Sequence, residues 1–91
     1  MTSAILPVQD LDSNIGLRVQ CAMMLDGFPS AVTAAIEAAR ADLPAITKII
    51  AEQPDAMISG YFAEERTRDE RVQKIAQFIH AFFAYRASIG K

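Results

Sequence analysis

The sequence predicts an all-α protein, a compact bundle of four to five helices in which a long C-terminal helix, about residues 67–88, spans the domain. Three observations predict this class. Alanine, the best helix former and a poor strand residue, occurs 16 times. Four glycines and four prolines leave few tight turns. Helix-capping residues followed by apolar residues at helical spacing also recur along the chain.

The composition indicates one folded domain over residues 1–91. Hydrophobic residues make up 52% of the chain and charged residues 22%, which disfavours disorder. Residues 1–9 contain Pro7 and no periodicity, so we expect an extended tail there. No run approaches 18 apolar residues and no basic leader is present, which predicts a cytoplasmic protein without a membrane partner. Cys21 is the only cysteine, and we expect a buried, inert thiol.

Two secondary structures compete for residues 10–25. Asp12 is a suitable cap for a helix whose apolar residues, among them Ile15, Val19 and Met23, recur at about 3.6-residue spacing. Part of the same segment alternates between apolar and polar residues, as a strand does. The apolar run that continues to Leu25 breaks this alternation, and length therefore favours the helix.

A helical hairpin is predicted next. Ser30 is expected to cap a helix over residues 31–41, and Asp42 a helix from 43 to about 53 with Pro44 in its first turn. The short link makes the two helices antiparallel. A fourth segment covers residues 55–66, in which Gly60 either bends one helix or separates a short helix from a second that begins at Tyr61.

The last helix has the clearest local signals. Thr67 and Glu70 fit a capping box, and Gly90 is a natural stop. A helix of 22 residues is about 33 Å long, close to the diameter of a domain of this size. Its apolar arc is wider than a surface helix needs. The helix is therefore either central, with neighbours on several sides, or it binds a partner protein or a second copy through Phe78, Phe82 and Tyr85.

The charged run from Glu64 to Lys74 precedes this apolar stretch. We expect a solvated junction with a Glu70–Lys74 pair on the helix surface. The alternative is a docking patch for an acidic partner made by Arg66, Arg68 and Arg71. Net charge is −2, and four acids offset the local bases, so we do not expect a nucleic-acid partner.

No motif indicates catalysis, a cofactor or a metal. His80 is the only histidine and has no ligand-type residue three or four positions away. The sequence therefore predicts a non-enzymatic protein-interaction module, such as a regulator, inhibitor or chaperone-like adaptor. It binds another protein or a second copy through the aromatic face of the last helix. The alternatives are a DNA-binding helix-turn-helix regulator formed by the hairpin and a small helical enzyme with an arginine pocket.

Overall fold

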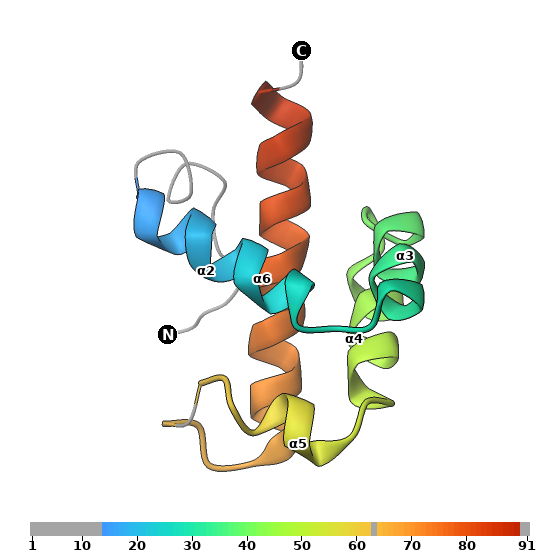
Figure 1. The fold of residues 1–91 in the computed structure, drawn as a ribbon, viewed down its shortest axis with the longest axis vertical. Coiled ribbons are helices and arrows are strands. Elements are labelled where there is room, and N and C mark those ends of the chain that lie inside the picture. The colour runs from blue at the N-terminus through green and yellow to red at the C-terminus, as the bar shows by residue number, and fades with distance from the viewer. Residues whose placement is uncertain (1–13, 63, 90–91) are drawn as a thin grey trace.

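A computed structural model describes residues 14–62 and 64–89, and every regular element in these ranges is a helix (Figure 1). The helices are α2 (Ile15–Asp26), α3 (Ser30–Ala38), α4 (Leu43–Ala51), α5 (Asp55–Ile58) and α6 (Arg68–Ile89). The all-α prediction and the long C-terminal helix are confirmed. The predicted tail over residues 1–9, the Asp12 cap and the Gly90 stop lie outside the described residues.

Helix α6 is the central element of the fold. It has 22 residues, or about 33 Å of helix, against a longest molecular extent of 36 Å. Figure 1 shows α2 crossing one side of α6, α3 and α4 on another side, and α5 close to its first turns. The wide apolar arc of α6 is thus covered by several neighbours, which favours the central-helix interpretation over a free face.

The core is built around α6 by one to three buried apolar residues from each shorter helix. The fully buried side chains outside α6 include Cys21, Met24, Ile36, Ile46, Ile50 and Ile58. The buried residues that α6 contributes are Val72, Ile75, Ala76, Ile79, Ala81, Phe83 and Tyr85. No polar or charged residue is buried among the described residues, so apolar burial supplies the main stabilisation.

Residues 15–26 form a helix, so the strand alternative is wrong. Asn14 takes the N-cap position in extended conformation, and its Oδ1 accepts a hydrogen bond from the backbone N–H of Leu17 at 3.1 Å. The predicted cap of α4 is confirmed, since Asp42 Oδ1 accepts from the backbone N–H of Ala45 at 3.2 Å. Both caps satisfy amide groups that the first helical turn leaves unpaired.

Two predicted helix boundaries are wrong. Ser30 is the first residue of α3 rather than its cap, and the N-cap residue Pro29 makes no side-chain hydrogen bond there. The helix also ends at Ala38 instead of near residue 41. The chain turns at this point because the Asp42 backbone N–H bonds to the carbonyl of Ala39 at 2.7 Å, and this turn brings Asp42 into the extended conformation that caps α4.

No helix is present at residues 61–62 or 64–66. α5 stops at Ile58, and Phe62 adopts a left-handed backbone with φ of 53°. This conformation is uncommon for a bulky residue. It accompanies a tertiary contact, because the Phe62 ring packs edge-on against Phe78 with ring centroids 4.8 Å apart. The predicted second helix beginning at Tyr61 is therefore absent from the described residues of this segment.

The capping box of α6 is confirmed in both directions. The Glu70 backbone N–H donates to Thr67 Oγ1 at 3.1 Å, and Glu70 Oε1 accepts from the Thr67 backbone N–H at 3.2 Å. Because the Glu70 carboxylate faces the helix start, the predicted Glu70–Lys74 pair is not formed. Lys74 Nζ instead pairs with Glu65 Oε2 at 2.8 Å, and this hydrogen bond raises the pKa of Lys74.

Candidate interaction surface

The three aromatic residues that were predicted to bind a partner differ in how deeply they are buried. Tyr85 is 6% exposed and belongs to the core. Phe78 and Phe82 are half-buried and pack against the core from its edge. Phe78 also contacts the ring of Phe62. A fully exposed aromatic face therefore does not exist on α6.

Helix α2 covers the Phe78 and Tyr85 side of α6. Arg18 Nη1 donates a hydrogen bond to Tyr85 Oη, and the Arg18 guanidinium lies 5.3 Å from the centroid of the tyrosine ring. The Cys21 thiol makes a weak contact with the backbone carbonyl of Phe78 at 3.5 Å. Burial raises the pKa of Cys21 to about 11, so this thiol stays neutral and inert as expected. These contacts dock α2 on the surface that the sequence assigned to a partner.

The exposed apolar surface lies on the opposite side of α2. Ile15, Val19 and Met23 are 69%, 50% and 63% exposed and follow one another at four-residue spacing. Residues four apart lie on one face of a helix, so the three side chains form a continuous row. We call this set the outer row of α2. It contains three of the four large hydrophobic residues that are exposed in the described part of the chain, the fourth being Ile89 at 61%.

Sequence reasoning missed the outer row because it placed the same residues on one predicted apolar stripe. The stripe that faces the core is instead Cys21, Met24 and Leu25. Both stripes are apolar, so the sequence alone does not say which one faces inward. Arg18 could have indicated which stripe faces inward. It lies beside the stripe of Cys21, Met24 and Leu25, and its long cationic side chain is suited to reach a buried tyrosine hydroxyl.

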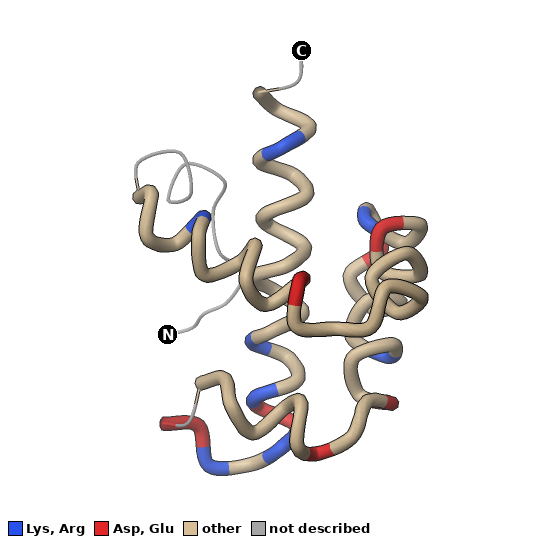
Figure 2. Tube along the Cα trace, in the orientation of Figure 1, with Lys and Arg blue, Asp and Glu red and all other residues tan. Residues whose placement is uncertain are grey.

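Charge is scarce around the outer row. Its exposed neighbours on α2 are Gly16, Gln20 and, at the last helical position, Asp26. Arg18, the single base on this helix, is engaged with Tyr85. Figure 2 shows that charged residues instead gather at the other end of the molecule, around α5 and the start of α6. Within α2, the outer row is thus an apolar strip with the acidic Asp26 at its C-terminal end.

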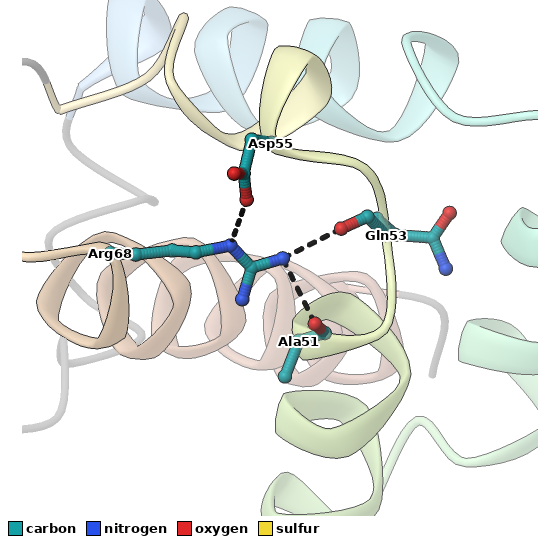
Figure 3. A network of polar contacts seen from close by, with 4 residues as sticks. All are labelled: Ala51, Gln53, Asp55 and Arg68. Carbon is teal, nitrogen blue, oxygen red and sulfur yellow. Dashed lines mark hydrogen bonds and ion pairs between the residues drawn. The ribbon is translucent and has the colours of Figure 1, made fainter.

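Arg68 has an intramolecular role in the structure. Its Nη2 donates to the backbone carbonyls of Ala51 at 3.0 Å and Gln53 at 2.6 Å, and its Nε pairs with the carboxylate of Asp55 (Figure 3). These contacts join the end of α4 and the start of α5 to the first turn of α6. The planar guanidinium group suits this arrangement because it donates in several fixed directions.

The other two predicted docking arginines do not join Arg68 in a common patch. Arg66 is exposed, and its backbone N–H donates to Glu70 Oε1 at 3.2 Å, whereas its side chain makes no hydrogen bond to the described residues. Arg71 is half-buried, and its Nε has no hydrogen-bond partner among the described residues. The charged junction therefore combines one structural arginine with one exposed and one half-buried arginine.

The hairpin of α3 and α4 offers little to a nucleic acid. Thr47 Oγ1 donates to the Leu43 carbonyl at 2.8 Å, and Gln53 Nε2 to the Ile49 carbonyl at 3.0 Å, so both side chains are turned back to the backbone. Lys48 is the single exposed base on α4. A recognition helix needs several donors directed at bases and phosphates, and α4 lacks such a set.

Two arginines meet at a shallow hollow between α3 and α6. Arg40 and Arg86 line it together with Glu37 and Phe83, and its volume is about 290 Å³. The Arg86 guanidinium lies 5.7 Å from the Phe83 ring centroid. Both arginines are exposed and Glu37 offsets part of their charge, so the hollow differs from the buried arginine pocket that the enzyme alternative requires. In the part of the chain that the structure describes, no group of three metal-ligating side chains occurs.

Neither the length of the helices nor similarity to known proteins indicates a function. Among residues 14–62 and 64–89, no single helix is long and apolar enough to cross a membrane, whereas α2 and α3, which meet at 118°, pass that test only as a bent pair. No protein-family model matches the chain, and neither the curated proteins nor the solved structures give a significant match. The exposed apolar surface of the described residues is therefore the feature that bears most directly on function.

Proposed function

We propose that this chain is a small non-enzymatic interaction protein that acts by binding another protein chain through the outer row of α2. The observation that carries the proposal is the row itself, three large apolar side chains that are each at least half exposed on a helix whose other side is in the core. Contiguous apolar surface of this kind marks interaction sites. Covering it contributes about 25 cal/mol per Å² of apolar area removed from water.

The chemistry of the row supports a protein partner over a membrane surface. Helices that lie on membranes carry lysine and arginine beside their apolar face, which attract anionic lipids. Around the outer row the one base is Arg18, which is bonded to Tyr85, and the nearest exposed charge on α2 is the acid Asp26. Met23 adds a flexible, polarisable side chain that adapts to the shape of a partner.

A position-specific photo-crosslinking experiment tests the proposal. A diazirine amino acid replaces Val19 in the full chain, in cells of the organism that makes it, and a second chain carries the same group in place of Ile89. Ile89 is a matched control because it is equally exposed and apolar but lies at the end of α6. We expect a discrete protein adduct at position 19 that is absent at position 89.

The adduct must also depend on the rest of the row. Ile15→Gln combined with Met23→Gln should abolish it, whereas Ile89→Gln should leave it unchanged. Both row residues are exposed, so each glutamine variant should keep its unfolding free energy within about 0.5 kcal/mol of wild type. An adduct that survives both row substitutions, or equal labelling at positions 19 and 89, would contradict the proposal.

A further inference from the structure

We propose that the hollow between α3 and α6 binds a small monocarboxylate, with the carboxylate group held between Arg40 and Arg86. The two arginines come from distant parts of the chain, the turn after α3 and the last turn of α6, and line one hollow of about 290 Å³. This volume is close to the lower end of the range for small-molecule sites. The proposal concerns a second site and does not depend on the outer row of α2.

Neither arginine is used in an ion pair with another described residue. The ion pairs that the structure shows in residues 14–62 and 64–89 involve Arg68 and Lys74 instead. Asp42 lies two positions after Arg40, but its carboxylate is engaged in capping α4. Two positive charges beside one hollow repel each other, and an anion placed between them is attracted to both. The hollow therefore favours an anionic ligand.

Contacts within the chain restrict the orientation of both guanidinium groups. The Arg86 guanidinium lies 5.7 Å from the ring centroids of both Phe82 and Phe83, a distance at which the rings attract it. Arg40 Nη1 donates to the backbone carbonyl of Glu37 at 3.2 Å. A guanidinium group has several further N–H donors that remain available to a ligand. Because both groups are restricted before binding, less side-chain entropy is lost when a ligand binds.

The rest of the lining selects the class of anion. Glu37 also lines the hollow, and its negative charge repels a second negative charge on a ligand, which disfavours a phosphate dianion. Phe83 and Ala87 supply apolar surface for the body of the ligand. A planar carboxylate matches the paired donors of a guanidinium group. A single carboxylate on a small apolar body therefore fits the hollow better than inorganic phosphate does.

An NMR titration of the ¹⁵N-labelled full chain tests the proposal. Sodium isobutyrate is the probe, and sodium chloride keeps the ionic strength constant. We expect saturable shifts of the Nε–H signals of Arg40 and Arg86, with a Kd of about 0.1–10 mM. Isobutyramide has the same apolar body without the charge and should cause no saturable shift. Inorganic phosphate should bind about tenfold more weakly than isobutyrate.

Substitutions assign the binding to these residues. Arg40→Gln and Arg86→Gln should each raise the Kd for isobutyrate by about tenfold or more. Glu37→Gln should tighten the binding of phosphate several-fold more than that of isobutyrate, because it removes the repelling charge. Arg66→Gln is the matched control, since Arg66 is exposed and its side chain makes no hydrogen bond to the described residues. This variant should leave the Kd unchanged. All of these side chains are exposed, so the fold should tolerate each change.

Three results would overturn the proposal. The absence of a saturable shift up to about 50 mM isobutyrate would mean that the two arginines only interact with the negative ends of their helices. An effect of Arg66→Gln as large as that of Arg86→Gln would indicate non-specific attraction of anions. Phosphate binding as tight as that of isobutyrate would contradict the selection by Glu37. Each of these results would leave the proposed function standing, because crosslinking at position 19 tests the outer row separately.

Discussion

Replacing Arg68 with alanine tests whether this residue joins the helices or docks a partner. The change removes two hydrogen bonds to the carbonyls of Ala51 and Gln53 and the ion pair with Asp55. Hydrogen bonds from charged donors contribute about 1.5–3 kcal/mol when water is excluded. The Arg68 side chain is 35% exposed, so water replaces part of this contribution. We expect Arg68→Ala to lower the unfolding free energy by about 2 kcal/mol.

Most of this loss should come from the carbonyl contacts. The Asp55 side chain is 86% exposed, and an exposed ion pair contributes about 0–1 kcal/mol. Asp55→Asn should therefore cost less than about 1 kcal/mol. Arg68→Lys should recover only part of the loss, because an ammonium group cannot reproduce the fixed directions of the guanidinium donors.

Urea unfolding of the full chain measures these differences. Arg66→Ala is the matched control, because Arg66 is exposed two positions away and its side chain makes no hydrogen bond to described residues. Its unfolding free energy should stay within about 0.5 kcal/mol of wild type. If Arg68→Ala proved as mild as Arg66→Ala but weakened row-dependent crosslinking, the docking role that the sequence predicted would be correct and our structural role wrong.

Three further predictions concern the interface between α6 and its neighbours. Phe83→Ala should lower the unfolding free energy, measured in urea, by about 3–5 kcal/mol because Phe83 is 5% exposed. Phe82 is half-buried, so Phe82→Ala should lower it by roughly half as much. Equal losses for the two variants would contradict this difference in burial. Tyr85→Phe should cost about 1–2 kcal/mol through loss of the charged hydrogen bond from Arg18, and an unchanged unfolding curve would contradict that bond. Burial raises the pKa of Cys21 from 9.0 to about 11. Between these values the unfolded chain loses this proton first, so Cys21 should make stability fall as pH rises. The fall is measured as the difference in pH dependence between wild type and Cys21→Ala, and identical slopes would contradict it.

Features that depend on neighbouring residues in the chain were predictable from the sequence. The capping box of Thr67 and Glu70 and the cap at Asp42 need only residues three positions apart, and both form as predicted. The start and the length of the last helix were predicted from its capping box and its long apolar pattern, whereas its central position was one of two alternatives that the sequence left open. These two starts were predictable because their hydrogen bonds lie within the first helical turn. The Ser30 cap was also a local prediction and was wrong, because α3 begins one residue earlier and has Pro29 at its N-cap.

Features that depend on distant residues were not predictable in the same way. The chain leaves helical conformation before residue 62 where the Phe62 ring meets Phe78, 16 positions later. The side of α2 that faces α6 carries the hydrogen bond from Arg18 to Tyr85, two residues that are 67 positions apart. A one-dimensional pattern does not encode either distance. It also cannot rank two apolar stripes on the same helix, and that is why the outer row was missed.

The position of the exposed apolar surface follows from how this fold covers its central helix. α4 covers only part of the apolar surface of α6. α2 packs over another part, which includes Tyr85. That placement shields the predicted partner face of α6 but turns Ile15, Val19 and Met23 outward. Large apolar side chains that stay exposed on a helix mark a surface that a partner covers. Among the described helices none covers the outer row. We therefore expect the binding surface on α2, with Val19 at its centre.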